Sequence, residues 1–226
     1  MKTKLIISIL IIVSLFLTAC YPTGNVTADP NDQCSGLEGN NKDICYLELN
    51  KCSKISSETY RDPCVLELAK TKQDIAVCDL IVTDKAKASC QEQIAILTNN
   101  SKICGTIEDQ YWKDNCNYNF GMADDSEDFC SLVTRKEQRE ECFEKVSLST
   151  HNIKLCRYLG ETQRIDGCIY NIAKDSKDAN FCKKITGQVS KDVCYKKIAN
   201  LSEDKTLCEN IHFDQIKEDC VNQFLV

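Results

Sequence analysis

The spacing of the cysteines constrains the fold of this chain more than any other feature. The chain has 17 cysteines among its 226 residues. From Cys52 to Cys220 they follow one another at steps that alternate strictly between twelve and fourteen positions. This pattern is a 26-residue repeat that runs seven times, and an irregular copy beginning at Cys34 precedes it. A constant period of this length is typical of stacked supersecondary units that bury their apolar faces against one another.

The residues around the cysteines predict that each repeat is helical. We call the first cysteine of each repeat A and the second B. The side chains three residues after A and four residues after B are apolar in every copy, and the fifth residue after B is usually small. Because spacings of three and four residues mark one helical face, these positions are predicted to point inward. The residues after A are Leu37, Ile55, Ile81, Ile107, Val133, Leu159, Ile185 and Ile211, and those after B are Leu49, Leu68, Ile94, Phe120, Val146, Ile172, Ile198 and Phe224.

The ends of the helices can also be located. Four residues before A, six copies carry Asp, Asn or Ser, which favour helix N-caps because their side chains accept hydrogen bonds from free N–H groups. Each repeat is therefore predicted to be a helix of about two turns, a tight turn, and a helix of about three turns. No segment alternates polar and apolar residues as a strand does. The predicted fold class is all-α, an α-solenoid of about eight disulfide-stapled helical hairpins. The cap residues are Asp74, Asn100, Ser126, Asn152, Asp178 and Asp204.

The 16 cysteines of the repeat region are predicted to form disulfides, because an even count in an exported chain is typical of a disulfide framework. No C-x-x-C pair is present to seed a metal or haem site, so neither a metal nor another cofactor is expected. Helix geometry alone allows A to pair with its own B or B with the next A. The irregular first copy favours the former. Its B cysteine, Cys45, and the next A cysteine, Cys52, would lie about 10.5 Å apart in a continuous helix, beyond the roughly 7 Å limit for a bridge. The predicted pairs are Cys34–Cys45, Cys52–Cys64, Cys78–Cys90, Cys104–Cys116, Cys130–Cys142, Cys156–Cys168, Cys182–Cys194 and Cys208–Cys220.

The bridges offset a small core. A 26-residue hairpin buries few apolar side chains, and helices this short are marginal alone. A disulfide that closes a loop of about 13 residues contributes on the order of 3 kcal/mol in the chain-entropy account. The repeats loosely resemble tetratricopeptide-type solenoids and, because of their bridges, the cysteine-bridged Sel1-like arrays. The repeats of both are longer, and the cysteine spacing of the Sel1-like arrays differs. The resemblance implies stacking of hairpins and implies no functional residue.

The N-terminal segment predicts export and lipidation. Lys2 and Lys4 precede an apolar run from Leu5 to Leu17, which is typical of a secretory signal and too short to span a membrane. Residues 17–20 (LTAC) resemble the lipobox of prokaryotic lipoproteins, whose cysteine receives a diacylglyceryl group, so Cys20 is the predicted lipidation site. We expect residues 1–19 to be a lipoprotein signal peptide, residues 20–33 a lipidated cysteine with a flexible tether, and residues 34–226 the repeat domain. The predicted location is the outer face of a membrane.

Charge and motifs exclude several classes of function. Without residues 1–19 the chain has 26 basic and 34 acidic side chains, so nucleic acid is not an expected partner. The only histidines, His151 and His212, lie in no metal or nucleophile motif. The acidic run 124–128 lacks the glycine and the final glutamate of an EF-hand loop and is better interpreted as a helix start. No catalytic residue is predicted, and we expect that the protein is not an enzyme.

Two surface features remain as candidate sites. A Lys or Arg followed by an Asp or Glu precedes B in six copies, for example Lys191-Asp192. Such pairs either form a charged ladder for a ligand or link neighbouring repeats, and a feature repeated at one structural position favours the second interpretation. The copy that starts at Cys104 concentrates aromatic residues, and Tyr111, Trp112 and Tyr118 are candidate partner-binding residues. Asn99 and Asn200 match the N-glycosylation acceptor pattern.

These features favour a membrane-anchored scaffold that binds a protein or an envelope polymer outside the cytoplasm. Two alternatives remain. One is an envelope enzyme, most readily a thiol–disulfide redox protein, which would require an exposed cysteine with a lowered pKa. The other is a passive structural spacer, which predicts that deletion of one internal repeat leaves function intact.

Overall fold

A computed structural model of the chain describes residues 32–225. The predicted signal peptide, the lipidation site Cys20 and most of the predicted tether therefore lie outside the described residues. The described part contains helices and turns without a strand, so the predicted all-α class is confirmed. It comprises two compact units, one ending at Tyr60 and the other beginning at Arg61. In the described chain, no helix is both long enough and apolar enough to cross a membrane.

The first unit holds the irregular first hairpin. A hydrogen-bonded turn around Cys34 is followed by α2 (Gly39–Glu48), the short 3₁₀ helix η1 (Cys52–Lys54) and the start of α3 (Glu58–Lys72). Ile55 is buried as predicted. The prediction that Leu37 and Leu49 point inward is wrong, because their side chains are 40% and 38% exposed. Periodicity assigns a residue to a core register, but burial also requires a neighbouring hairpin to cover it.

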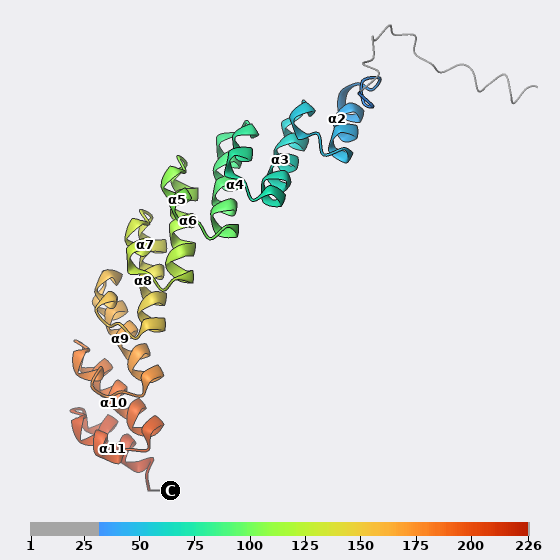
Figure 1. Cartoon of the computed structure of the whole chain (residues 1–226). Coiled ribbons are helices and arrows are strands. Elements are labelled where there is room, and N and C mark those ends of the chain that lie inside the picture. The colour runs from blue at the N-terminus through green and yellow to red at the C-terminus, as the bar shows by residue number, and fades with distance from the viewer. Residues whose placement is uncertain (1–31, 226) are drawn as a thin grey trace, which may run out of the picture. The chain divides into compact units, whose positions relative to one another are not determined.

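The second unit is a regular two-row stack of long helices and short segments (Figure 1). After α3, the long helices are α4 (Asp84–Leu97), α6 (Gln110–Ala123), α8 (Lys136–Thr150), α9 (Thr162–Ser176), α10 (Gln188–Ser202) and α11 (Asp214–Asn222). The short segments are η2 (Ile75–Leu80), α5 (Lys102–Thr106), α7 (Glu127–Leu132), η3 (Leu155–Leu159), η4 (Cys182–Lys184) and η5 (Lys205–Asn210). From α5 onward, each short segment packs against the long helix before it and the long helix after it, and consecutive long helices pack against each other.

The predicted helix lengths need correction. The first helix of a repeat is shorter than two full turns and is often a 3₁₀ helix, whereas the second has 14 residues in α4 and α6 and 15 residues in α8, α9 and α10. The first helix is short because the chain returns to an extended conformation three residues after A, as at Ile81 and Val133.

Two of the six predicted N-caps of the first helices are confirmed. Asp74 and Asp204 are the N-cap residues of η2 and η5, and each carboxylate accepts a backbone N–H two residues later. Asn152 and Asp178 accept the same bond but stabilise a turn, because η3 and η4 begin only after Lys154 and Phe181. Ser126 precedes α7 without such a bond, and α5 begins after Ser101 instead of Asn100.

The disulfides follow the predicted pairing, with A bonded to its own B. The Cα atoms of the bonded cysteines are 5.5–5.8 Å apart in the seven bridges Cys34–Cys45, Cys78–Cys90, Cys104–Cys116, Cys130–Cys142, Cys156–Cys168, Cys182–Cys194 and Cys208–Cys220. Cys52 and Cys64 are disulfide-bonded as well, as the eighth predicted bridge requires. Repeated disulfides of this kind indicate an oxidising compartment outside the cytoplasm.

The small residue five positions after B has a packing reason. Gly121 lies against the bridge of the following hairpin: a Cβ added there would be 2.7 Å from Sγ of Cys142 and 3.1 Å from Sγ of Cys130. At the same position of the next repeat, Oγ of Ser147 lies 3.0 Å from Sγ of Cys168. Each of these disulfides thus closes its own hairpin and also forms part of the contact with the preceding one.

Substitution of Gly121 by alanine is expected to destabilise the protein by about 1–2 kcal/mol, because overpacking outweighs the gain in helix propensity. Gly167 is the matched control. It lies inside α9, and an added Cβ would meet no atom within 4 Å, so Gly167→Ala should stabilise the protein by about 0.5–1 kcal/mol. Guanidinium unfolding curves measure both. Equal shifts of the same sign would contradict the contact between Gly121 and the sulfurs.

The helices from α2 to α10 that close a hairpin end in the same way, whereas α11 is followed by Gln223 in a right-handed conformation. Within two residues of the helix end, a single residue adopts the left-handed conformation: Asn50, Gln73, Asn99, Asp125, His151, Lys177 and Glu203. The N–H of the following residue then donates back to a carbonyl in the last turn, for example Asp178 N to Ala173 O at 3.1 Å. This is a Schellman-type end, which usually uses glycine because a Cβ is disfavoured at positive φ.

Replacing Lys177 by glycine is therefore expected to raise the free energy of unfolding by about 0.5–1 kcal/mol, since glycine adopts positive φ without the steric cost. Asn99→Gly should give a smaller gain, because asparagine tolerates this conformation better than lysine does. Thermal unfolding of the two variants beside the parent protein checks the order, and a loss of stability in Lys177→Gly would contradict it.

Candidate functional site

The aspartate two positions before B is buried between hairpins in five copies, whereas Glu218 at the same position of the last described hairpin is exposed. Asp43, Asp62, Asp114, Asp166 and Asp192 are at most 8% exposed. Asp114 accepts hydrogen bonds from the backbone N–H groups of Thr134 (3.0 Å) and Arg135 (2.9 Å) in the next hairpin, as well as from the Thr134 hydroxyl (2.9 Å). Similar pairs of backbone N–H groups bind Asp43, Asp166 and Asp192, and the Thr83 hydroxyl binds Asp62.

These carboxylates are caps supplied by the preceding hairpin. Arg135, Gly187 and Phe213 are the N-cap residues of α8, α10 and α11, whose own side chains form no cap bond. The negative charge therefore lies at the N-terminus of the next long helix, where free N–H groups and the helix dipole favour it. The interpretation that the charged pairs link neighbouring repeats is confirmed for these carboxylates. The cation of the pair stays within its own hairpin in two cases, where Arg139 donates to the carbonyl of Val133 and Lys217 pairs with Glu209.

Two junctions use a different arrangement. Glu140 replaces aspartate and accepts a hydrogen bond from the Arg164 guanidinium, because its longer side chain reaches past the turn. Ala88 replaces the acid in α4, and there Asp109 caps α6 from within the same hairpin by accepting N–H groups from Tyr111 and Trp112. A cavity of about 110 Å³, lined by Asp84, Lys87, Glu108 and Asp109 among others, lies beside Ala88.

The α4–α6 junction also contains a buried glutamate. Glu92 is 7% exposed and accepts a hydrogen bond from Nδ2 of Asn119 in α6 at 3.0 Å. Burial raises the pKa of Glu92 above its usual value, and the bond from Asn119 only partly opposes this shift. This junction therefore combines a missing carboxylate, a polar cavity and a buried acid.

Two of the three candidate partner-binding residues form one cluster. The rings of Tyr111 and Trp112 meet edge to face, with centroids 5.3 Å apart. Arg135 from the next hairpin places its guanidinium 4.3 Å from the centre of the Tyr111 ring and donates to Oδ1 of Asn115. Tyr111 is 54% exposed. The surface cluster thus comprises Tyr111, Trp112, Asn115 and Arg135, and it lies on two hairpins.

Tyr118 has a different environment. Its side chain is half-buried against the apolar core of the C-terminal hairpins. Burial, together with a hydrogen bond to Glu141, raises the pKa of its hydroxyl. Arg135 and Asn115 were not identified from the sequence, since their contact with Tyr111 depends on how adjacent hairpins align.

The remaining candidates lie apart from this cluster. His151 is exposed at the left-handed end of α8, and His212 contacts Gln188 through Nδ1 at 3.0 Å. In the acidic run 124–128, Ser126 precedes α7 and the next two acids occupy its first turn. No group of metal-binding side chains occurs in the described residues. The acceptor Asn99 is exposed, and Asn200 donates to Gln223.

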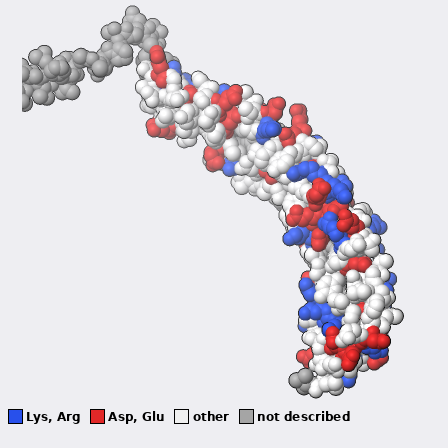
Figure 2. All heavy atoms as spheres, turned by 180° about the vertical axis from the view of Figure 1, so that it is seen from behind, with Lys and Arg blue, Asp and Glu red and all other residues white. Residues whose placement is uncertain are grey.

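Charges are mixed over the visible face in Figure 2, where acidic and basic side chains are interspersed.

Comparison of the chain with protein-family models, curated proteins and solved structures finds no match. The chain is thus described by its own architecture: tandem helical hairpins, each closed by a disulfide and most of them joined by a buried carboxylate.

Proposed function

We propose that the protein is an exported lipoprotein, anchored through Cys20, whose helical array is a scaffold that binds a protein or an envelope polymer and performs no catalysis. The observation that carries the proposal is the surface cluster of Tyr111, Trp112 and Arg135, in which Tyr111 is exposed and the other two are half-buried. Aromatic and arginine side chains are enriched at binding hot spots, and these three are held in place by one another and by Asn115. The lipobox-like segment and the disulfides support export.

The cysteines support a structural role over the redox alternative. Cys78, Cys90, Cys130 and Cys142 have no exposed surface, whereas thiol–disulfide exchange requires access of a thiolate to sulfur. For the passive spacer, deletion of any single internal repeat should leave function intact. For a scaffold, only deletions that disrupt the surface cluster should abolish binding.

Trp112→Ala is expected to weaken capture of a saturable partner from a native envelope extract at least tenfold, because truncation of a hot-spot residue commonly costs more than the free energy that corresponds to a tenfold change in affinity. The matched control is Phe213→Ala, because Phe213 is an aromatic residue 47% exposed in the last hairpin. Binding curves from quantitative pull-downs provide the measurement. Equal capture by both variants, or no saturable partner, would contradict the proposal.

The anchor has a separate test. Mass spectrometry of the N-terminal peptide from membranes should show a diacylglyceryl group on Cys20, and Cys20→Ser should release the protein from the membrane fraction. An unmodified Cys20 in the membrane-bound protein would refute lipidation without affecting the scaffold.

A further inference from the structure

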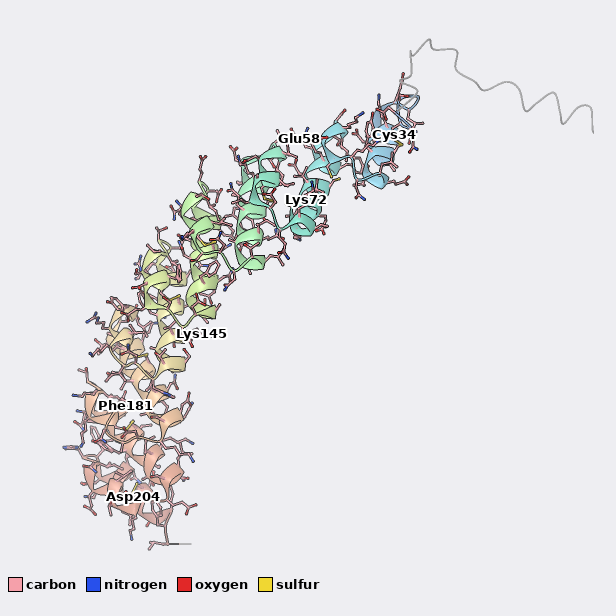
Figure 3. All side chains as sticks on the ribbon, in the orientation of Figure 1. Cys34, Glu58, Lys72, Lys145, Phe181 and Asp204 are labelled. Carbon is pink, nitrogen blue, oxygen red and sulfur yellow. A yellow bond between two sulfur atoms is a disulfide. The ribbon has the colours of Figure 1, made fainter. Side chains whose placement is uncertain are left out.

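The junction between α4 and α6 differs from the other junctions in a pair of backbone N–H groups. In four other junctions, the residues four and five positions after A donate their N–H groups to an aspartate two positions before the preceding B. Glu108 and Asp109 occupy these positions here, but Ala88 stands where the aspartate would be. Among the described residues, neither N–H has an acceptor. In Figure 3 this junction lies between the labelled residues Lys72 and Lys145.

A cavity lies at the same place. Its volume is about 110 Å³, and Ala88, Glu108 and Asp109 line it together with Asp84 and Lys87. Because Ala88 is 3% exposed, the cavity begins at a buried methyl group where the other junctions hold a carboxylate. A space of this size is large enough for several water molecules or for a small organic group.

The side chains around the cavity indicate the kind of group that fits it. In two of the other junctions, a glutamine six positions before B donates its amide N–H to the capping carboxylate, with distances of 2.7 Å from Gln110 to Asp114 and 2.8 Å from Gln188 to Asp192. Asp84 occupies the glutamine position in α4. The cavity therefore offers an acceptor where those junctions offer a donor. A group that binds here has to accept from the N–H pair and donate to a carboxylate.

The charge of the lining disfavours an anion. Asp84, Glu108 and Asp109 are acidic, and the Lys87 ammonium pairs with Asp79 at 2.7 Å. This pair, together with Glu108 and Asp84, raises the pKa of Lys87. A carboxylate from a ligand would meet a lining of net negative charge. A neutral amide supplies the required acceptor and donor without a charge.

We propose that this cavity is a binding site for a neutral amide group, whose carbonyl oxygen accepts from the N–H groups of Glu108 and Asp109 and whose own N–H donates to Asp84. A side-chain carboxamide of a peptide and the acetamido group of an aminosugar share this chemistry. The inference goes beyond the scaffold function, because the site lies between α4 and α6 whereas the surface cluster lies on α6 and the hairpin after it. The site therefore stands whether or not the surface cluster binds a partner.

Titration of the isotope-labelled oxidised protein with acetamide, followed by nuclear magnetic resonance, tests the site. We expect the backbone N–H resonances of Glu108 and Asp109 to shift with a dissociation constant of about 1–10 mM, since so small a ligand makes few contacts. Acetate has the same shape with a negative charge and should bind about tenfold more weakly. An absence of shifts at about 0.1 M acetamide would show that water alone fills the cavity. That result, or equal binding of acetate, would overturn the inference.

Two substitutions at one position separate the polar contacts from the filling of space. Ala88→Asn supplies a carboxamide from within the chain, and Ala88→Leu is the matched control because leucine has the same shape without polar atoms. Both should abolish the shifts. Only Ala88→Asn should raise the melting temperature, by about 2–4 °C, because it supplies the acceptor that the N–H pair lacks. Shifts that persist in Ala88→Asn, or an equal rise in both variants, would overturn the inference.

A second titration distinguishes the two sources of the amide. N-acetylglucosamine carries it on a sugar, and the tripeptide glycyl-glutaminyl-glycine carries it on a side chain. One of the two should bind about tenfold more tightly than acetamide, because the rest of the ligand adds contacts, and the tighter ligand identifies the source. If neither binds more tightly than acetamide, the cavity is not a site for a ligand of either kind and the inference is overturned.

Discussion

Replacement of Asp114 by alanine is expected to lower the free energy of unfolding by about 3 kcal/mol, because each buried donor left unsatisfied costs about 1–3 kcal/mol. The carboxylate has no exposed surface and accepts bonds from the backbone of Thr134 and Arg135 and from the side chains of Thr134 and Gln110. Its removal leaves these donors without their acceptor and uncaps α8. Guanidinium unfolding of the oxidised protein measures the change.

The α4–α6 junction supplies a matched control for this prediction. There the chain lacks the inter-hairpin carboxylate at Ala88 and uses Asp109 as a cap from within the same hairpin. Arg135→Asp alone should destabilise the protein, because it places a second carboxylate beside Asp114. In the Asp114→Ala background the same change should restore about 1 kcal/mol by capping α8. An additive result, with Arg135→Asp unfavourable in both backgrounds, would contradict the capping role of Asp114.

The lowered pKa of Asp114 predicts that the stability of the protein depends on pH. Burial alone would raise the pKa of Asp114, but hydrogen bonds from Thr134, Arg135 and Gln110 outweigh it and hold the pKa below the usual 3.8. A group whose pKa is lower in the folded state stabilises the fold above its unfolded pKa and loses this contribution as the pH falls through its folded pKa. The free energy of unfolding should therefore decline below about pH 4, and less so in Asp114→Ala.

Removal of one internal disulfide is the second change with a large expected effect. The double replacement Cys130→Ala and Cys142→Ala should cost about 3 kcal/mol or more, because it frees a closed loop in the unfolded-state account and removes the sulfurs that pack against Gly121. The pair Cys34 and Cys45 closes a loop of nearly the same length but follows no other hairpin in the described chain. Its removal should cost less. Melting curves of the two double variants measure the two losses of stability. Equal losses would show that the inner bridge contributes only loop closure.

Much of the array could be predicted because it depends on local periodicity. The alternating steps between cysteines, the apolar positions after each of them and the shortened link between Cys45 and Cys52 together predicted helical hairpins with A bonded to B. The lengths of the helices were harder to predict from the sequence. The left-handed residues that end the long helices are mostly Lys, Glu, Gln and Asn instead of glycine, so the usual sequence signal for a helix end is absent.

The candidate site was only partly predictable, because it depends on register between repeats. Tyr111 and Trp112 are adjacent in the sequence, and their clustering was expected. Arg135 lies 24 residues away from Tyr111 and reaches it only because α8 begins beside α6. At the junction where Ala88 stands in place of the acid, Asp109 caps α6 instead. No local sequence signal indicates this, since the pattern of a single sequence does not show which of the two capping arrangements a junction uses.

The most direct test of the account is a disulfide map of the unreduced protein by peptide mass spectrometry. Lysine or arginine residues lie between every neighbouring pair of the 16 cysteines except Cys116 and Cys130, which Met122 separates, so trypsin with cyanogen bromide resolves all pairings. The account predicts eight bridges, each joining the two cysteines of one hairpin, and no free thiol in residues 34–226. Bridges from B to the next A, or a majority of free thiols, would contradict it.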